Sequence, residues 1–489
     1  MDSDRELLIG NPTDTQNEAI NRNYDSVNDT EELSVENRAN KLPQYVATIS
    51  ATLSALSAGV VLGWTSPISD DIKSGKYNHI AVNENEIGWI GSFTTLGALT
   101  FGLITGKICD VIGRKSTLIL LIIPFGLGWI LILWANNLTM LYFGRCITGI
   151  AAGACSIAAP LYINEIAQKE IRGALGSYFQ LMVTVGILYA YCFGKFLTID
   201  NYTVMCSLVP AAFVCIFIFQ PETPLYYLKT NQYDKAVAAL KHLRGNNYNV
   251  QAEIQALDNS LTATDSSISD IFNRRTVKPM AIVLALMFFQ QFGGVNAIIF
   301  YTSHIFDEAH VYVLDAKTAS IVVAVMQVIA TFISSLIVDK AGRKVLLIGS
   351  TLVMSISCLL LGLFFSLKYR TAIDSNTMNS LGFLPVLSLC LYIIAFSLGL
   401  GPIPWIIPSE IFNSDIKGIA TSFVGSFNWF LAFVITKFYL DVETVIGQDT
   451  SFYIFAVMCS DVIGCLFSYF ILPETKGKTS EEIQNALNT

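Results

Sequence analysis

Three amide side chains stand close together in an otherwise apolar stretch of the sequence, at Gln290, Gln291 and Asn296. An amide both donates and accepts hydrogen bonds, and inside a bilayer it costs free energy unless it has a partner or faces a cavity. On an ideal helix Asn296 lies about 120° from Gln290 and about 140° from Gln291. A distortion at Gly293 and Gly294 would turn all three toward one cavity, where they suit a ligand rich in hydroxyl groups. The alternative for any single amide is a hydrogen bond between helices.

The composition places these amides in a membrane protein. Of the 489 residues, 53% are hydrophobic and only 14% are charged, whereas soluble domains carry about 25% charged residues. None of the ten cysteines forms a C-x-x-C pair, and the four histidines form no cluster. Zinc, nucleotide and catalytic patterns are missing from the sequence, and no basic stretch suits nucleic acid. We therefore expect no enzyme activity, no cofactor, no metal and no nucleic-acid partner.

Twelve apolar stretches are each long enough to cross a bilayer as a helix, which needs about 20 residues. Backbone polar groups at membrane depth are satisfied only in helices or closed barrels, so we predict an all-α membrane protein. The predicted spans begin near Tyr45, Ile87, Ser116, Met140, Ala174, Thr203, Pro279, Lys317, Val345, Leu384, Gly418 and Ser451.

Charge and polarity predict the orientation and the division of the chain. Most of the 30 Lys and Arg residues fall on the side of the termini, so the positive-inside rule places both termini in the cytosol. The polar segment from Gln220 to about Lys278 has a helical pattern and separates six spans from six. The predicted parts are a disordered N-terminal tail (1–42), a six-helix bundle (43–220), an intracellular helical domain (221–277), a second six-helix bundle (278–472) and a C-terminal tail (473–489).

The same charged patterns occur in both bundles. The motif after span 2, with Asp110, Arg114 and Lys115, occurs again 229 residues later, after span 8. The glutamate after span 4, Glu165, has a counterpart 245 residues later, and the proline after span 6, Pro221, has one 252 residues later. Such offsets indicate duplication into parallel six-helix repeats. Ordinary positive-inside topology explains the basic residues but not their acidic partners. We predict ion pairs of Asp110 with Arg114 and of Glu165 with Arg172 across the helix ends. They would belong to a gate that holds the halves shut at the cytosolic side, formed by Asp110, Arg114, Glu165, Arg172, Glu222, Asp339, Arg343, Glu410, Lys417 and Glu474.

The ordered set of motifs resembles the sugar porter family of the major facilitator superfamily over about residues 44–485. Within that family the chain is similar to short-loop facilitative glucose transporters and to insect facilitated trehalose and hexose transporters. It departs from the family at Leu225, where Arg is usual, and we expect a thinner ion network in the first half for that reason. It also departs at Ser397, where several glucose transporters have an acidic residue. The matching motifs are Gly144-Arg145, Pro160 to Glu165, Pro221 to Pro224, Gln290 to Asn296, Gly399 to Trp405, and Pro473 to Thr479, beside the two D-x-x-G-R-K loops.

The resemblance implies a major facilitator fold of twelve helices in two pseudo-repeats with a cytosolic helical linker, and it implies site residues. Tyr301 would belong to an outer gate, and the glycines and prolines of span 10 predict a mobile half-helix, since proline interrupts helical hydrogen bonding. An interfacial aromatic is the alternative for Tyr301. The implied sugar ligands are Gln180, Gln290, Gln291, Asn296, Gln327, Trp405, Asn428 and Trp429.

Transport without proton coupling is the predicted mode. Span 1 has no acidic residue, so Arg145 in span 4 lacks the titratable partner that proton symporters of the family carry. We expect uniport of a hexose such as glucose by a monomer in the lipid bilayer. Trehalose transport, proton symport and a non-transporting sensor are the alternatives, and the role of Asp461 in span 12 is open. We expect the plasma membrane, with endosomes or lysosomes as the alternative suggested by Asp4, Leu8 and Ile9.

Overall fold

A computed structural model describes residues 39–80, 82–168, 170–246, 248–261, 274–309, 315–371, 380–412 and 414–459, with residues 474 and 483. The regular elements within these ranges are all helices. The predicted tails lie outside the described residues, apart from 39–42, Glu474 and Ile483, and so does Asp461.

The first half of the chain forms α2 (Leu42–Gly63), the 3-10 turn η1 (Ser66–Ile68), α3 (Ser69–Lys73), α4 (Glu84–Ile112), α5 (Arg114–Leu120), α6 (Ile122–Leu133), α7 (Leu138–Ile166), α8 (Arg172–Phe196) and α9 (Ile199–Phe217). The linker forms α10 (Pro224–Lys229), α11 (Tyr233–Arg244) and α12 (Gln251–Leu261). The second half forms α13 (Arg274–Phe292), α14 (Val295–Ala309), α15 (Ala316–Ala341), α16 (Arg343–Arg370), α18 (Leu384–Leu398), α19 (Ile403–Ile411), α20 (Ser414–Ile446) and α21 (Gln448–Cys459).

The predicted spans agree with these helices. In the described part of the chain, ten helical segments are long and apolar enough to cross a membrane. The number rises to eleven if the bent pair Glu84–Gly102 and Ile104–Ile112 is counted as one further span. Each predicted start lies near the N-terminus of a described helix. The predicted twelfth span begins with α21, and the rest of it lies outside the described residues.

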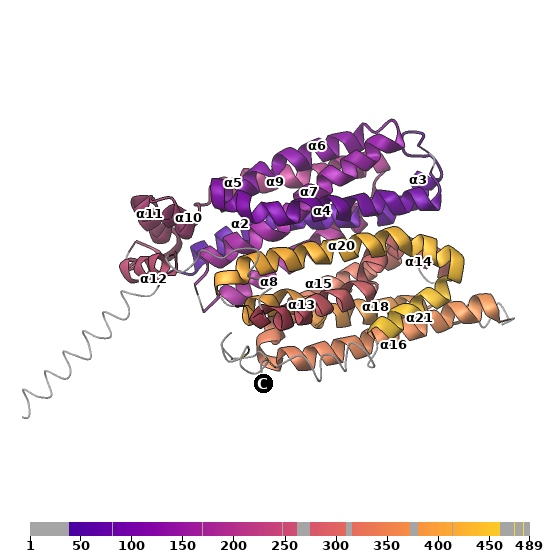
Figure 1. Ribbon diagram of the computed structural model, residues 1–489. Helices are drawn as coiled ribbons and strands as arrows, with labels where there is room; N and C mark the ends of the chain where they lie inside the picture. The colour runs from indigo at the N-terminus through magenta and orange to yellow at the C-terminus, as the bar shows by residue number, and fades with distance from the viewer. Residues whose placement is uncertain are drawn as a thin grey trace, which may run out of the picture.

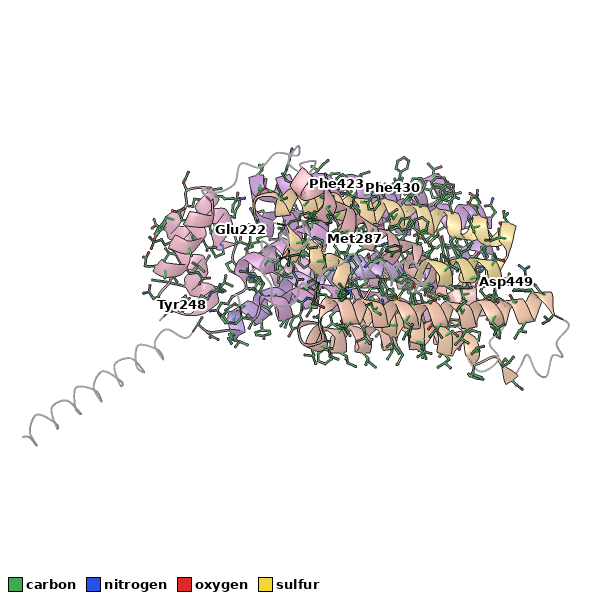
Figure 2. All side chains as sticks on the ribbon, turned by 60° about the horizontal axis from the view of Figure 1, so that its bottom comes forward. Glu222, Tyr248, Met287, Phe423, Phe430 and Asp449 are labelled. Atoms are coloured by element: carbon green, nitrogen blue, oxygen red, sulfur yellow. The ribbon has the colours of Figure 1, made fainter. Side chains whose placement is uncertain are left out.

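The two halves lie side by side along their length, and the linker helices project from one end (Figure 1). We name the end that carries α10–α12 the linker end. The opposite end, which carries α3 and the C-terminal part of α14, is the far end. The halves meet chiefly where α4 packs along α20 and where α8 packs along α15. Large apolar side chains such as Phe423 and Phe430 of α20 point away from the bundle, as expected of a surface in contact with lipid (Figure 2).

Small residues allow the helices of one half to approach closely. A Cβ added at Gly149 of α7 would lie 2.0 Å from the Thr94 carbonyl oxygen of α4, and one at Gly97 would lie 2.1 Å from the Cys146 carbonyl oxygen. Helices in membranes associate through such close backbone contacts, because lipid offers no hydrophobic gain for their association. The sequence of α4 and α7 therefore specifies the tight pair that supports the first half.

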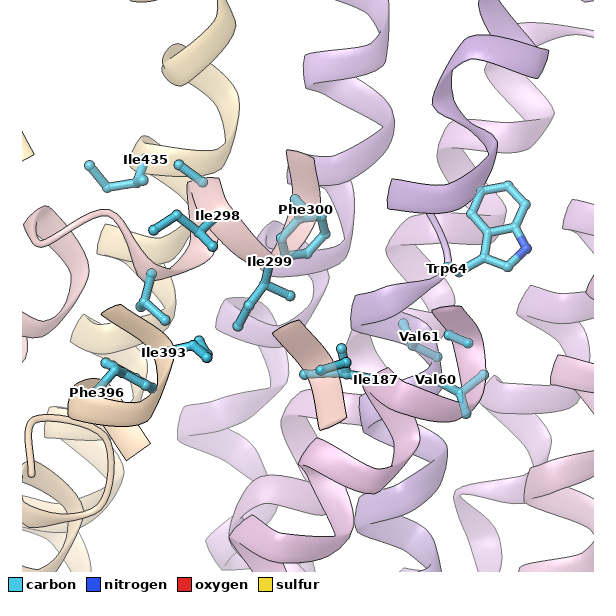
Figure 3. Close-up of a cluster of buried hydrophobic side chains, with 14 of the residues drawn as sticks. Val60, Val61, Trp64, Ile187, Ile298, Ile299, Phe300, Ile393, Phe396 and Ile435 are labelled. Atoms are coloured by element: carbon cyan, nitrogen blue, oxygen red, sulfur yellow. The ribbon is translucent and has the colours of Figure 1, made fainter. Parts of the chain in front are cut away.

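The α14 helix lies between the halves. Ile393 and Phe396 of α18 lie on one side of its Ile298 and Ile299, and the first half with Val60, Val61 and Ile187 lies on the other (Figure 3). Phe300 packs against the first half, because a Cβ at Gly91 of α4 would lie 3.3 Å from its ring. All of these side chains belong to one buried apolar cluster. Because α14 contacts both halves, any relative movement of the halves would change its contacts.

Both predicted helix breaks are present. The seventh span divides into α13 and α14 at Gly293 and Gly294, and Gly294 has a φ of +92°. The tenth span divides into α18 and α19 across Gly399–Pro402. The distortion predicted near the amides is thus confirmed, while the mobility predicted for span 10 stays a prediction.

Gly294→Ala tests the first break. We expect a loss of about 2–4 kcal/mol of stability, because an L-residue is strained at this φ and its Cβ would overpack the core. That Cβ would lie 2.7 Å from the Phe455 ring. Gly349→Ala in α16 is the control, since its Cβ would meet nothing within 4 Å. The midpoint of thermal unfolding in detergent should fall for the first variant alone, and equal midpoints would contradict the strain at Gly294.

Candidate functional site

Four amide side chains form one hydrogen-bonded chain in the interior of the second half. Asn296 Nδ2 donates to Gln291 Oε1, and Gln291 Nε2 donates to Asn428 Oδ1 at 3.0 Å. Asn428 Nδ2 donates to Gln290 Oε1 at 2.7 Å, and Gln290 Nε2 donates to the carbonyl oxygens of Leu400 and Gly401 at 2.8 and 2.9 Å. The chain of amides therefore ends on the backbone of the break in span 10.

Each of these amides is almost fully buried, with 3% to 9% of its surface exposed. Buried amides without partners cost about 1–3 kcal/mol each, so the sequence must supply the partners together. Asn428 comes from α20, 132 residues after Asn296, yet it joins Gln290 to Gln291. The structure thus brings four of the eight predicted ligands into direct contact.

The other four predicted ligands lie outside this hydrogen-bonded chain. Trp405 of α19 is half-buried, and its ring lies 3.6 Å from the Cβ position of Gly425, three residues before Asn428. Trp429 Nε1 donates to Ser156 Oγ of the first half at 3.4 Å. Gln327 of α15 is buried and Gln180 of α8 is half-buried, and neither side chain hydrogen-bonds to a described residue.

Tyr301 is buried rather than interfacial, with 1% of its surface exposed. Its hydroxyl donates to the Thr436 carbonyl oxygen at 2.7 Å, and its ring stacks on Tyr439 with centroids 5.5 Å apart. Its φ of −124° and ψ of 18° interrupt α14. Tyr301 marks a bend from which the far-end part of α14 extends, and its part in an outer gate stays a prediction.

Arg145 is a fully buried cation in α7, and its partners in the described part of the chain are not carboxylates. Its guanidinium donates to the carbonyl oxygens of Val61 and Ile90 at 2.9 and 3.2 Å and to Thr65 Oγ1 at 3.1 Å. It also lies 5.1 Å from the ring centroid of Trp64. Dipoles and an aromatic face therefore satisfy this charge.

The predicted charged motifs gather at the linker end. In the first half Arg114 bonds Asp110 at 2.8 Å and Glu165 at 2.9 Å. Glu222 accepts hydrogen bonds from the backbone N–H groups of Lys115 at 3.0 Å and Ser116 at 3.3 Å. A carboxylate at a helix N-terminus interacts favourably with the unpaired N–H groups there. Glu222 therefore caps α5, and Figure 2 labels this residue at the linker end.

The second half repeats this geometry. Arg343 bonds Glu410 at 2.8 Å, and Glu474 accepts from the backbone N–H groups of Arg343 and Lys344 at 3.1 and 3.2 Å. Arg114 and Arg343 each also donate at 3.2 Å to the carbonyl oxygen five residues earlier. The duplication predicted from the offsets is therefore visible in the hydrogen bonds. The side chains of Asp339 and Lys417 lie outside the described part.

Three expectations about these charges need correction. Glu165 does not pair with Arg172, because Arg172 is exposed and donates to the Ala167 carbonyl oxygen instead. Leu225 stands where the family usually has Arg, but the ion network of the first half does not lack a cation there, because Lys229 pairs with Asp110 at 2.9 Å. No described ion pair at the linker end joins the two halves in this conformation. Arg114 and Arg343 pair within their own halves, and Lys229 connects the linker to the first half.

Beside the bond from Trp429 to Ser156, a group of bonds joins the halves at the far end, and the sequence did not indicate this group. Ser66 of η1 contacts Ser303 of α14 at 3.3 Å, and Tyr191 of α8 donates to the Ile299 carbonyl oxygen. Ion pairs reinforce this closure, between Lys317 and Asp71 at 3.2 Å and between Lys195 and Asp315 at 3.3 Å. Buried Lys437 of α20 also faces α4. The one sequence feature that pointed to these contacts is Lys437 itself, a lysine inside an apolar span.

Comparison with known proteins identifies the family. The model of the "Sugar (and other) transporter" family matches residues 44–487. The chain belongs to this family of sugar transporters. It is 36% identical over 450 residues to the facilitated trehalose transporter Tret1 of Bombyx mori, covering 91% of this chain and 87% of the relative. It is 34% identical to Tret1 of Anopheles gambiae, but there it spans only 56% of the relative's length.

A solved structure supports the fold of the transporter. The proton:xylose symporter XylE of the major facilitator superfamily, from E. coli, matches with a TM-score of 0.73 and 25% identity. The match covers 90% of this chain and 98% of XylE. The chain therefore has the major facilitator fold, with its helices in two related halves, and it is a transporter rather than an enzyme.

Glu222→Gln tests the helix cap of the transporter. The loss of the charge at the α5 N-terminus should lower stability by about 1–2 kcal/mol. Arg172→Ala is the control at the same end, and we expect a change within about 0.5 kcal/mol because the side chain is exposed and has no carboxylate partner. Thermal unfolding in detergent measures both variants. An Arg172→Ala effect as large as that of Glu222→Gln would contradict the assignment.

Proposed function

We propose that this sugar transporter carries a small sugar, a hexose such as glucose, down its gradient by alternating access. The observation that carries the proposal is the buried chain of Gln290, Gln291, Asn296 and Asn428. A sugar presents hydroxyl groups that both donate and accept, and amides match both roles. Trp405 would supply an apolar face beside the amides, as binding sites for such ligands require.

Facilitated diffusion is supported by the surroundings of Arg145. A proton-coupled cycle needs a group that takes up and releases a proton within the membrane. The guanidinium of Arg145 contacts carbonyl oxygens, a hydroxyl and the Trp64 ring, and no described carboxylate stands beside it to serve that role. We therefore favour uniport over proton symport, which is the activity by which XylE is named.

Trehalose is the competing substrate, favoured by the names of the relatives in Bombyx mori and Anopheles gambiae. The orientation is also part of the proposal. The linker end, with its cluster of cations at Arg114, Lys229 and Arg343, would face the cytosol by the positive-inside rule. The far end would then face outward at the plasma membrane. In this conformation the described cross-half bonds close the far end.

Transport by purified protein in proteoliposomes tests the mode and the substrate. We expect labelled glucose to equilibrate across the membrane without accumulation, with or without a proton gradient, and trehalose to enter more slowly. Accumulation of sugar on acidifying one side would overturn uniport. Faster flux of trehalose than of glucose would assign trehalose as the substrate, and no flux of any sugar would overturn the proposal.

Gln291→Ala tests the site. It removes both the donor to Asn428 and the acceptor for Asn296, so sugar binding should weaken by more than about 1 kcal/mol, or about fivefold in the half-saturation constant. Gln44→Ala is the matched control, because Gln44 is also fully buried and bonds another amide, Gln168, at 2.9 Å near the linker end. The control should keep the parent half-saturation constant. An equal rise in both variants would mean a general defect in packing.

A further inference from the structure

Lys437 is a buried cation that the proposed sugar site does not use. Only 4% of its surface is exposed, and it lies in α20 nine residues beyond Asn428. At 1.5 Å per residue it is about 13 Å nearer the far end than the amide chain. A lysine within a membrane-spanning helix is costly unless it is paired, and such residues usually serve function. The partners of Lys437 therefore decide what it does.

Those partners come from both halves. Lys437 Nζ donates to Asp441 Oδ2 one turn along α20, and it lies 5.1 Å from the ring centroid of Trp89 in α4. The other oxygen of Asp441 accepts from Asn85 Nδ2 of α4 at 3.0 Å. The helices approach closely here, since a Cβ at Gly88 would lie 3.2 Å from the Lys437 carbonyl oxygen. The ammonium of Lys437 is thus covered by α4, while the carboxylate of Asp441 stays partly exposed beside it.

This arrangement differs from the charged clusters at the linker end. The bonds of Arg114 and Arg343 lie within one half each, so they survive any rigid movement of one half against the other. The Trp89 and Asn85 contacts exist only while the far ends of α4 and α20 are together. A cation held against an aromatic ring is stabilised more strongly when water is excluded. Parting the helices would remove that stabilisation, so these contacts favour one conformation over another.

We propose that Lys437 is a positioning residue of the transport cycle, whose ammonium, shared between Asp441 and the Trp89 ring, holds the far ends of the two halves together. This far-end latch consists of Asn85, Trp89, Lys437 and Asp441. It biases the transporter toward the conformation closed at the far end. The inference rests on the alternating access of the proposed function, but it does not depend on which sugar is carried.

Accessibility of a cysteine at position 303 tests the latch. Ser303 is 3% exposed and touches Ser66 across the halves, so Ser303→Cys is protected while the far end is closed. A membrane-impermeant maleimide is added to intact cells, and labelling is measured against the chain without this cysteine. Addition of Lys437→Met should raise the labelling rate about tenfold. Lys437→Arg should stay within about twofold of the parent, because a guanidinium keeps the charge and stacks on indole.

Trp89→Leu gives the second arm of the experiment. It should raise labelling in the same direction, and the double variant with Lys437→Met should add little, since both changes remove one interaction. If Lys437→Met fails to fold, Trp89→Leu and Asp441→Asn still test the latch. Unchanged labelling in folded Lys437→Met or folded Trp89→Leu would overturn the proposal, and so would fully additive effects of these two changes.

Lys368→Met is the matched control at the far end. Lys368 Nζ also lies 5.1 Å from an aromatic centroid, that of Tyr369, but it donates to the Glu308 carbonyl oxygen and all three residues belong to the second half. We expect parent labelling for this variant. Labelling equal to that of Lys437→Met would overturn the latch as the cause. The readout needs no sugar, so a failed sugar assignment and a failed latch give different results.

Discussion

Two helix breaks in the second half leave backbone N–H and C=O groups without helical hydrogen bonds inside a membrane protein. The arrangement of side chains in this half depends on satisfying these groups. At the first break Tyr392 donates to the Gly293 carbonyl oxygen at 2.8 Å. At the second, Gln290 satisfies the carbonyl oxygens of Leu400 and Gly401, and Ser350 accepts from the Leu400 N–H at 3.1 Å. Irregular backbone at membrane depth is tolerated only where protein or a cavity satisfies it. The amide chain therefore both stabilises the breaks and assembles the candidate sugar site.

The charged residues divide into two kinds by position. At the linker end, Arg114 with Glu165 and Arg343 with Glu410 bind helices of the same half, and Glu222 and Glu474 cap helices there. These contacts make each half a firm unit. At the far end several contacts run between the halves, among them Ser66 with Ser303 and Lys317 with Asp71. Rigid halves joined by breakable contacts are the physical requirement for alternating access, because the movement then concentrates at the interface.

The α14 helix connects the site to the far end. Asn296 in its first turn bonds Gln291, whereas Ser303, beyond the bend at Tyr301, touches the first half. A ligand that engages Asn296 would therefore act on the same helix that closes the far end. A ligand shifts a conformational equilibrium only by the difference in its affinity for the two conformations. A sugar that binds Asn296 more tightly when the far end is closed would therefore favour the closed conformation through α14.

The sequence by itself determined the spans, the duplication, the two helix breaks and the family, because hydropathy, glycine and proline content and motif order act locally along the chain. It also named the four amides that meet, although Asn428 was named only through the resemblance. The tertiary structure decided the partners. Glu222 bonds the backbone at the start of α5, and Lys229 supplies a cation that Leu225 lacks. The described ion pairs at the linker end do not join the two halves. Lys437 shows the reason, since the ring that holds it lies 348 residues away in the chain and only folding brings the two together.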